Sequence, residues 1–193
     1  MHNELIYKNE VYRKLIHLSS LFFPWLLWMI GKKMFLSFMA PILCFFILLD
    51  YIKHSFPKIR DLYYYFFNDV TRENEHDTVT GATWVFIGII STVVLFNQQI
   101  AIISLMVLSI SDSMASLIGI KYGKTKLLKK TLEGSFAFYL STFLILSIFT
   151  KLSTTYAIIS SMIITVAELI DINVNDNIRI PLTTAILLYL GGI

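Results

Sequence analysis

Four ionisable residues near the start of the chain share one helical stripe. Glu10, Arg13, Lys14 and His17 follow one another at intervals of three, four and seven positions from Glu10, which a helix places on one face. Anchoring at a membrane surface explains the arginine and the lysine, but not a histidine one turn deeper. Arginine suits phosphate oxygens as a two-pronged donor and lysine as a point charge. We therefore interpret the stripe as an anion-binding face.

Asp112 lies inside an apolar stretch, on the same helical face as Ser109, Ser113 and Ser116. A carboxylate at that depth costs about 2.5 kcal/mol or more when it faces lipid, so we expect it to face the protein interior or a water-filled pocket. Two interpretations remain open. One is an ion pair with a lysine of a neighbouring helix, and the other is a metal ligand or the acid of a phosphate site.

A lysine-rich loop follows, with five lysines between positions 121 and 130. Lys126 and Lys129 are interpreted as membrane anchors. Gly123 would let the backbone approach a ligand closely. Thr131 is a candidate N-cap of the next helix, whose free N–H groups would then face an anion. The loop does not match the P-loop pattern, so any nucleotide site here is of another type.

Carboxylates gather again near the end of the sequence. Glu168 aligns with Thr165 at helical spacing, and Asp176 and Asn177 precede the last apolar stretch. Capping of that last helix is one interpretation, above all for Asn177. The alternative is a site for a hard cation, because Mg²⁺ takes oxygen ligands and usually shares them with substrate phosphates.

A fourth polar block precedes the third apolar stretch. Arg72 and Glu75 belong to its charged half, which a solvated loop also explains. Within the apolar stretch, Gly88 and Ser91 are predicted to let helices pack closely. The role of Thr80 to Thr83 stays open.

The elements that must position these residues are apolar helices. The chain has 193 residues, of which 56% are hydrophobic, and a mean hydropathy of +0.69. We predict an all-α, polytopic transmembrane bundle in a single domain, 1–193. Its roughly seven spans lie near 15–31, 34–52, 79–96, 99–120, 134–150, 153–170 and 179–193. Pro57 should end the second span before an aromatic-rich interfacial helix. Cys44, in mid-span, is expected to be buried.

Charge is distributed unevenly between the two ends of this bundle. All 13 acidic residues fall at one end, together with every lysine and arginine except Lys32, Lys33 and Lys151. Because basic residues are retained on the cytoplasmic side, this distribution predicts a cytoplasmic amino terminus and a site that faces the cytoplasm. It indicates an integral membrane enzyme that receives charged groups from one side and lipid from the bilayer. Nothing indicates a nucleic-acid partner.

In this order, the blocks resemble the CTP-dependent lipid-alcohol kinases, which are the dolichol, polyprenol and phytol kinases and the CTP-type diacylglycerol kinase. The resemblance extends from Glu10 to about Pro181. The residues that carry it are Glu10, Arg13, Lys14, His17, Arg72, Glu75, Thr80 to Thr83, Asp112, Ala115, Gly119, Gly123, Lys130, Glu133, Gly134, Glu168, Asp176, Asn177 and Pro181. The chain departs from the family at Ser111, Thr131 and Asn175, where glycine, serine and an acid are usual.

The resemblance implies Mg²⁺-dependent transfer of the γ-phosphate of CTP, or of another nucleotide triphosphate, to the hydroxyl of a membrane lipid alcohol such as a polyprenol, phytol or diacylglycerol. Asp112 and Asp176 would then hold Mg²⁺ with the help of Asn177. Phosphates would be held by Arg13, Lys14, Lys124 and Lys130, with Gly123, Thr131 and Arg72 as further candidates. Either Glu133 or His17 would orient or deprotonate the alcohol. Supporting roles would fall to Glu10, Glu75, Thr80 and Glu168.

Two other functions fit the same residues. A CTP:lipid cytidylyltransferase needs the same metal and cations but attacks the α-phosphate. A small membrane transporter also uses buried acids and histidine. Transporters usually have a repeated half and charges at the midplane, and neither is evident in this sequence.

Overall fold

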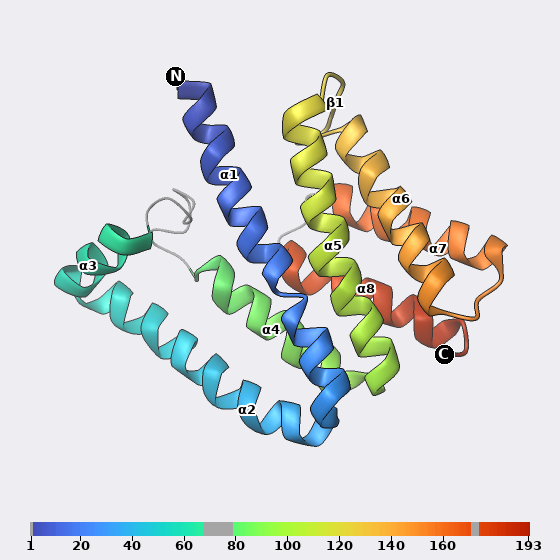
Figure 1. Cartoon of the computed structure of the whole chain (residues 1–193). Helices are drawn as coiled ribbons and strands as arrows, with labels where there is room; N and C mark the ends of the chain where they lie inside the picture. Colours follow the sequence, from blue (N-terminus) through green and yellow to red (C-terminus); the bar gives the residue numbers. More distant parts are fainter. Residues whose placement is uncertain (1, 68–78, 171–173) are drawn as a thin grey trace.

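The computed structural model describes residues 2–67, 79–170 and 174–193, and these residues are helical almost throughout (Figure 1). The helices are α1 (His2–Ser19), α2 (Phe22–Ser55), α3 (Pro57–Phe67), α4 (Gly81–Leu95), α5 (Gln98–Tyr122), α6 (Leu132–Phe149), α7 (Thr154–Leu169) and α8 (Asp176–Leu190). An antiparallel hairpin of β1 (Lys126–Leu127) and β2 (Lys130–Thr131) joins α5 to α6. The predicted helical membrane bundle is confirmed, and the hairpin in the lysine-rich loop is an addition to it.

The ends of the helices are set by identifiable residues. The first two predicted spans form one apolar run, Glu10–Ser55, which is interrupted by the turn between α1 and α2 and by a break at Gly31. Gly31 has a φ of 75°, a left-handed conformation that glycine adopts without steric cost. Phe56 is extended, and α3 begins at Pro57, as predicted. Within the described residues, this run, α5 and α6 are long and apolar enough to cross a membrane, and α4 and α7 are shorter apolar helices.

Loops that the sequence assigns to the end with few charges lie together. Lys32 Nζ donates hydrogen bonds to the carbonyl oxygens of Val94 and Phe96 at 3.1 and 2.9 Å. Asn97 Nδ2 donates to the carbonyl oxygen of Ile193 at 3.3 Å. In Figure 1 the amino terminus and the hairpin lie at the other end. These contacts agree with the predicted alternation of spans, whereas the side of the membrane that each end faces stays a prediction.

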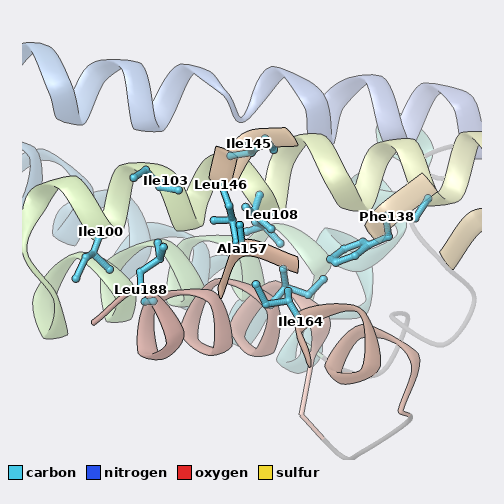
Figure 2. Close-up of a cluster of buried hydrophobic side chains, with 13 residues drawn as sticks. Ile100, Ile103, Leu108, Phe138, Ile145, Leu146, Ala157, Ile164 and Leu188 are labelled. Carbon is cyan, nitrogen blue, oxygen red and sulfur yellow. The ribbon is translucent and has the colours of Figure 1, made fainter. Parts of the chain in front are cut away.

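Helix α5 lies at the centre of the bundle because it contributes to both hydrophobic cores. One core joins α5 to α6, α7 and α8 and includes Leu108, Phe138 and Ile164 (Figure 2). The other joins α5 to α2 and α4 and includes Phe35 and Val93. The outer faces expose large apolar side chains, as expected in lipid. The expectation that Cys44 is buried was wrong, because Cys44 points outward from α2.

Close approach between helices depends on small residues. A Cβ added at Gly88 of α4 would lie 1.9 Å from the carbonyl oxygen of Asn177 in α8, and one at Gly134 of α6 would lie 2.7 Å from that of Ala115 in α5. The prediction that Gly88 serves helix packing is therefore confirmed. The same contact fixes the start of α8 against α4.

Substitution of Gly88 by alanine should therefore separate α4 from α8. We expect the free energy of unfolding to fall by about 1–3 kcal/mol, as for other overpacked positions. Thermal unfolding of the detergent-solubilised protein measures this, with Cys44→Ala on the outer face of α2 as the control. Equal unfolding temperatures for the two variants would contradict the packing assigned to Gly88.

Candidate active site

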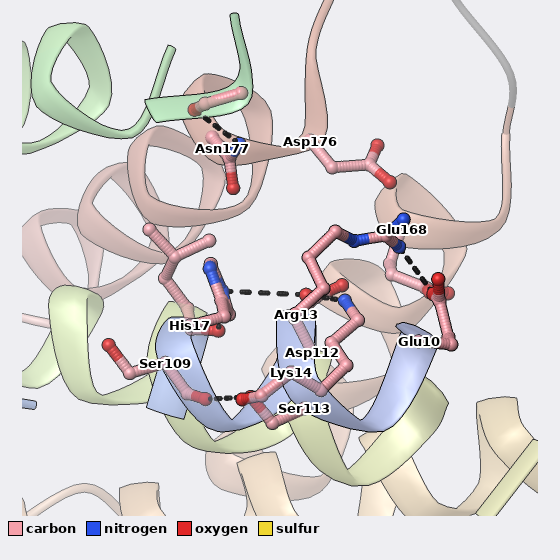
Figure 3. Close-up of polar contacts among 12 residues, drawn as sticks. Glu10, Arg13, Lys14, His17, Ser109, Asp112, Ser113, Glu168, Asp176 and Asn177 are labelled. Carbon is pink, nitrogen blue, oxygen red and sulfur yellow. Dashed lines mark hydrogen bonds and ion pairs between the residues drawn. The ribbon is translucent and has the colours of Figure 1, made fainter. Parts of the chain in front are cut away.

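Asp112 of α5 and Lys14 of α1 form a buried ion pair (Figure 3). Their side chains are only 12% and 8% exposed, so the attraction acts with little screening by water. One of the two interpretations of Asp112, an ion pair with a lysine of a neighbouring helix, is observed. A role in binding metal or phosphate stays a prediction.

His17 lies beside this pair, one turn further along α1. Its Nε2 is 3.4 Å from Asp112 Oδ2 and 3.2 Å from the carbonyl oxygen of Leu108. Both neighbours are hydrogen-bond acceptors, so in a neutral ring Nε2 carries the hydrogen and Nδ1 keeps its lone pair. The surroundings thus leave His17 with one nitrogen that can accept a proton.

Arg13 and Glu10 complete the predicted stripe on α1. They form an ion pair with each other, and both side chains are about one-fifth exposed, at 22% and 21%. Figure 3 shows Arg13, Lys14 and His17 on the same side of the helix. The stripe therefore runs from a partly exposed pair to a buried one.

A second charged cluster surrounds Lys130 at the base of the hairpin. Lys130 Nζ lies 2.5 Å from Glu168 Oε1 and 3.2 Å from Asp176 Oδ2, and it donates to the carbonyl oxygen of Glu168 at 2.6 Å. Burial alone would lower the pKa of Lys130, but the charges and hydrogen bonds of Glu168 and Asp176 outweigh burial and raise that pKa. Lys130 is therefore a fixed positive charge at neutral pH.

Arg179 of α8 lies on the buried side of this cluster, and the sequence had placed it in the same charged loop as Asp176 and Asn177 without assigning it a role in the site. It forms an ion pair with Asp176, and its NH2 group donates to the carbonyl oxygen of Glu168 at 3.4 Å. Arg179 and Glu168 are 8% and 2% exposed, whereas the side chains of Lys130 and Asp176 are 30% and 37% exposed. Arg179 thus contacts the partly exposed Asp176 from the buried side of the cluster. Its spacing of three residues from Asp176 repeats that of Glu10 and Arg13, and this pattern was the available signal.

The two clusters face one another and balance in charge. Asp112 interacts electrostatically with Lys130 and with Glu168. Figure 3 shows Asp176 and Asn177 of α8 opposite the stripe on α1. Four basic side chains, Arg13, Lys14, Lys130 and Arg179, stand against four carboxylates, Glu10, Asp112, Glu168 and Asp176. The predicted blocks from both ends of the sequence therefore converge at one end of the bundle.

Three of the remaining candidates of the hairpin region, Thr131, Gly123 and Glu133, make structural contacts. Thr131 is the N-cap of α6 and accepts a hydrogen bond from the Gly134 N–H at 3.2 Å, as predicted. Gly123 packs against Thr131. Glu133 accepts the Thr125 N–H at 3.2 Å. Lys124 is exposed. Roles of these residues in binding nucleotide stay predictions.

The other predicted site residues lie outside the two charged clusters. The N-cap of α8 is Asn175, whose side chain accepts the Asn177 N–H at 3.0 Å, so the interpretation of Asn177 as the cap was wrong. Asn177 Nδ2 instead donates to the carbonyl oxygen of Gly81 at 3.5 Å. Thr80 is hydrogen-bonded to Asp50. Arg72 and Glu75 lie outside the described residues.

A preformed metal site is not visible in the part of the chain that the structure describes, since no three side chains of His, Cys, Asp or Glu lie together there. Asp112 and Asp176, which the resemblance assigns to Mg²⁺, belong to different clusters and already have basic partners. Among the described residues, Glu168 Oε2 is a buried carboxylate oxygen without a hydrogen-bond partner. One or two carboxylates can still hold Mg²⁺ when phosphate supplies further oxygens.

This fold and site define an integral membrane protein with a charge-balanced polar site at one end of a helical bundle. An uncharacterized protein of Rickettsia prowazekii is 30% identical over 90% of both chains, and the two proteins belong to one family. CTP-dependent diacylglycerol kinase 1 of Schizosaccharomyces pombe is 28% identical over 95% of this chain and 94% of its own length.

CTP-dependent diacylglycerol kinase 1 of Saccharomyces cerevisiae is 32% identical over 62% of this chain. That match spans only 42% of the yeast kinase. These relatives support the family that the sequence motifs indicate. No family model matches the chain, and no solved structure matches it.

Replacement of Arg179 by methionine should destabilise the fold, because Asp176 would lose its buried partner. We expect the free energy of unfolding to fall by about 1–2 kcal/mol, because Asp176 is partly exposed and keeps Lys130 as a partner, whereas the buried Glu168 carbonyl oxygen loses the hydrogen bond of Arg179. Lys126→Ala is the matched control, since Lys126 is exposed on the hairpin. Thermal unfolding distinguishes the two, and an Arg179→Met variant as stable as Lys126→Ala would exclude a supporting role for Arg179.

Proposed function

We propose that this protein is a CTP-dependent lipid kinase that transfers the γ-phosphate of CTP to the hydroxyl of a membrane lipid alcohol. The observation that supports this proposal most is that basic and acidic side chains from α1, α5, β2, α7 and α8 converge at one end of a membrane bundle. The names of the yeast relatives favour a kinase over a cytidylyltransferase or a transporter, and diacylglycerol over a polyprenol or phytol as the first acceptor to test.

The basic side chains supply what phosphoryl transfer requires of a protein, which is mainly positioning and neutralisation of charge. Arg13 and Lys14 present donors on one side of the site, and Lys130 presents an ammonium group on the other. Each is already paired with a carboxylate. Phosphate oxygens would therefore exchange with these carboxylates as partners, which keeps the cations ordered before the nucleotide arrives.

The balance of charge supports a requirement for Mg²⁺. A triphosphate carries several negative charges into a site whose four basic side chains are already matched by four carboxylates. The residues that would hold the ion are Asp112 and Asp176, with Glu168 as a further oxygen donor. A bound Mg²⁺ would neutralise charge that develops on the phosphate oxygens.

His17 is the better placed of the two candidates for the lipid hydroxyl. Its Nε2 is held by Asp112 and by the Leu108 carbonyl, so Nδ1 can accept a proton. Glu133 is engaged by the Thr125 N–H. We place the site at the cytoplasmic end, in keeping with the basic residues there.

Transfer from γ-labelled CTP tests the proposal directly. Purified protein in detergent micelles or nanodiscs with diacylglycerol should label the lipid, whereas a cytidylyltransferase would release the label as pyrophosphate. Polyprenol and phytol are tested in parallel. Label in neither lipid nor pyrophosphate would refute both enzyme assignments.

Asp112→Asn and Lys130→Ala should each lower the transfer rate by about 10²-fold or more, because each removes a charge on which the phosphate site depends. Lys126→Ala should retain nearly full activity, since Lys126 is exposed on β1. Initial rates at saturating lipid measure the effect, with membrane insertion checked by sucrose-gradient flotation. Full activity of a correctly inserted Asp112→Asn or Lys130→Ala variant would remove that residue from the site.

Chelation of divalent cations should abolish transfer, and added Mg²⁺ should restore it. The physical reason is the excess negative charge that the triphosphate brings into a balanced site. Activity is measured after treatment with EDTA and then across a titration with Mg²⁺, with Ca²⁺ as a comparison ion. Undiminished transfer in EDTA would show that the lysines and arginines alone neutralise the phosphates.

A further inference from the structure

Asp50, near the end of α2, caps helix α4 from outside that helix. Its Oδ2 accepts hydrogen bonds from the Thr80 N–H at 3.1 Å, the Thr80 hydroxyl at 3.2 Å and the Thr83 hydroxyl at 2.6 Å. Thr80 occupies the N-cap position but makes no side-chain cap of its own. Asp50 therefore supplies both the missing acceptor and a negative charge at the positive end of the helix dipole.

Lys53 and α3 hold this carboxylate in place. Lys53 is 1% exposed, and its Nζ lies 3.4 Å from Asp50 Oδ1. The same ammonium group lies 5.4 and 5.8 Å from the ring centroids of Tyr63 and Tyr64, within the range of a cation–π interaction. The interfacial helix α3 thus covers a buried ion pair, and loss of either partner would leave the other charge uncompensated.

The first turn of α4 is in turn connected to the candidate active site. The Gly81 carbonyl accepts a hydrogen bond from Asn177 Nδ2 at 3.5 Å. Gly88, two turns further along α4, contacts the backbone of Asn177 so closely that no side chain fits between them. Asn177 directly follows Asp176, which pairs with Lys130 and Arg179. The start of α8, and with it Asp176, therefore rests on α4.

We propose that Asp50 is a positioning residue for the active site: by fixing the first turn of α4 it sets the position of Asp176 at the start of α8. This inference rests on the proposed function. Asp50 touches neither cluster and acts only through α4. The alternative is that Asp50 and Lys53 merely stabilise the fold, and the two roles predict different results when stability is restored without the cap.

The double variant Asp50→Leu/Lys53→Met distinguishes a positioning role from a purely stabilising one. Well-packed apolar residues often replace a buried ion pair with no loss of stability. Leucine, however, cannot accept the hydrogen bonds of Thr80 and Thr83. The apolar pair should offset most of the stability lost with the cap, so we expect an unfolding temperature no more than a few degrees below that of the wild type. At a temperature where the variant is fully folded, we expect a kcat lowered by about tenfold or more, because small misplacements at a reaction centre are costly.

Lys32→Met is the matched control, because Lys32 binds carbonyl oxygens at the opposite end of α4. It should lower the unfolding temperature and leave kcat within about twofold, since among the described residues Lys32 binds Val94 and Phe96 and neither of the two charged clusters. A stable double variant with wild-type kcat would overturn the inference. So would an equal loss of kcat in Lys32→Met.

A distance measurement tests the same inference without activity. Nitroxide labels at Ala82 of α4 and at Val174, both exposed, are introduced in a Cys44→Ala background. Pulsed electron spin resonance should show a broader or shifted distance distribution in Asp50→Leu/Lys53→Met than in the wild type. An unchanged distribution overturns the positioning role. A wild-type protein that fails to label lipid from CTP refutes the proposed function instead, and leaves this measurement to decide whether Asp50 fixes α4 against α8.

Discussion

The ion pair between Lys14 and Asp112 holds the amino-terminal helix against the central helix of the bundle. A carboxylate inside a membrane protein is costly unless it is paired, so Asp112 needs a cation from a neighbouring element. Lys14 supplies it, and the helical stripe then places Arg13 and His17 on the same face of α1. The position of α1, which rests mainly on α5, follows from this requirement.

The fold could be predicted from the sequence to a large extent because lipid imposes strong rules on local sequence. A backbone in hydrocarbon must be helical, and about 20 apolar residues are needed to cross it. The predicted spans therefore agree with α4 to α8 within a few residues, and Gly31 separates the first two. The stripe on α1 was equally accessible, because its members lie within two turns of one helix.

The parts of the site that escaped prediction depend on helices far apart in sequence. Asp50 is 30 residues from Thr80, whose N–H it accepts, and nothing near Asp50 indicates that partner. Arg179 was assigned to the charged membrane surface, but in the structure it lies under Asp176. Asn177 was interpreted as the N-cap of the last helix, whereas the N-cap in the structure is Asn175, two residues earlier. In each case, packing between helices selected one of several locally plausible roles.

Charge balance also explains how so many ionisable groups are retained at one end of an apolar bundle. Each buried carboxylate of the two clusters has a basic partner, so neither cluster presents a net charge to lipid. Such pairs contribute little net stability, because desolvation offsets most of their attraction. They do hold long side chains in defined positions. An arriving phosphate then replaces one anion by another around cations that are already ordered, and this exchange requires less reorganisation than the assembly of a site from solvated lysines.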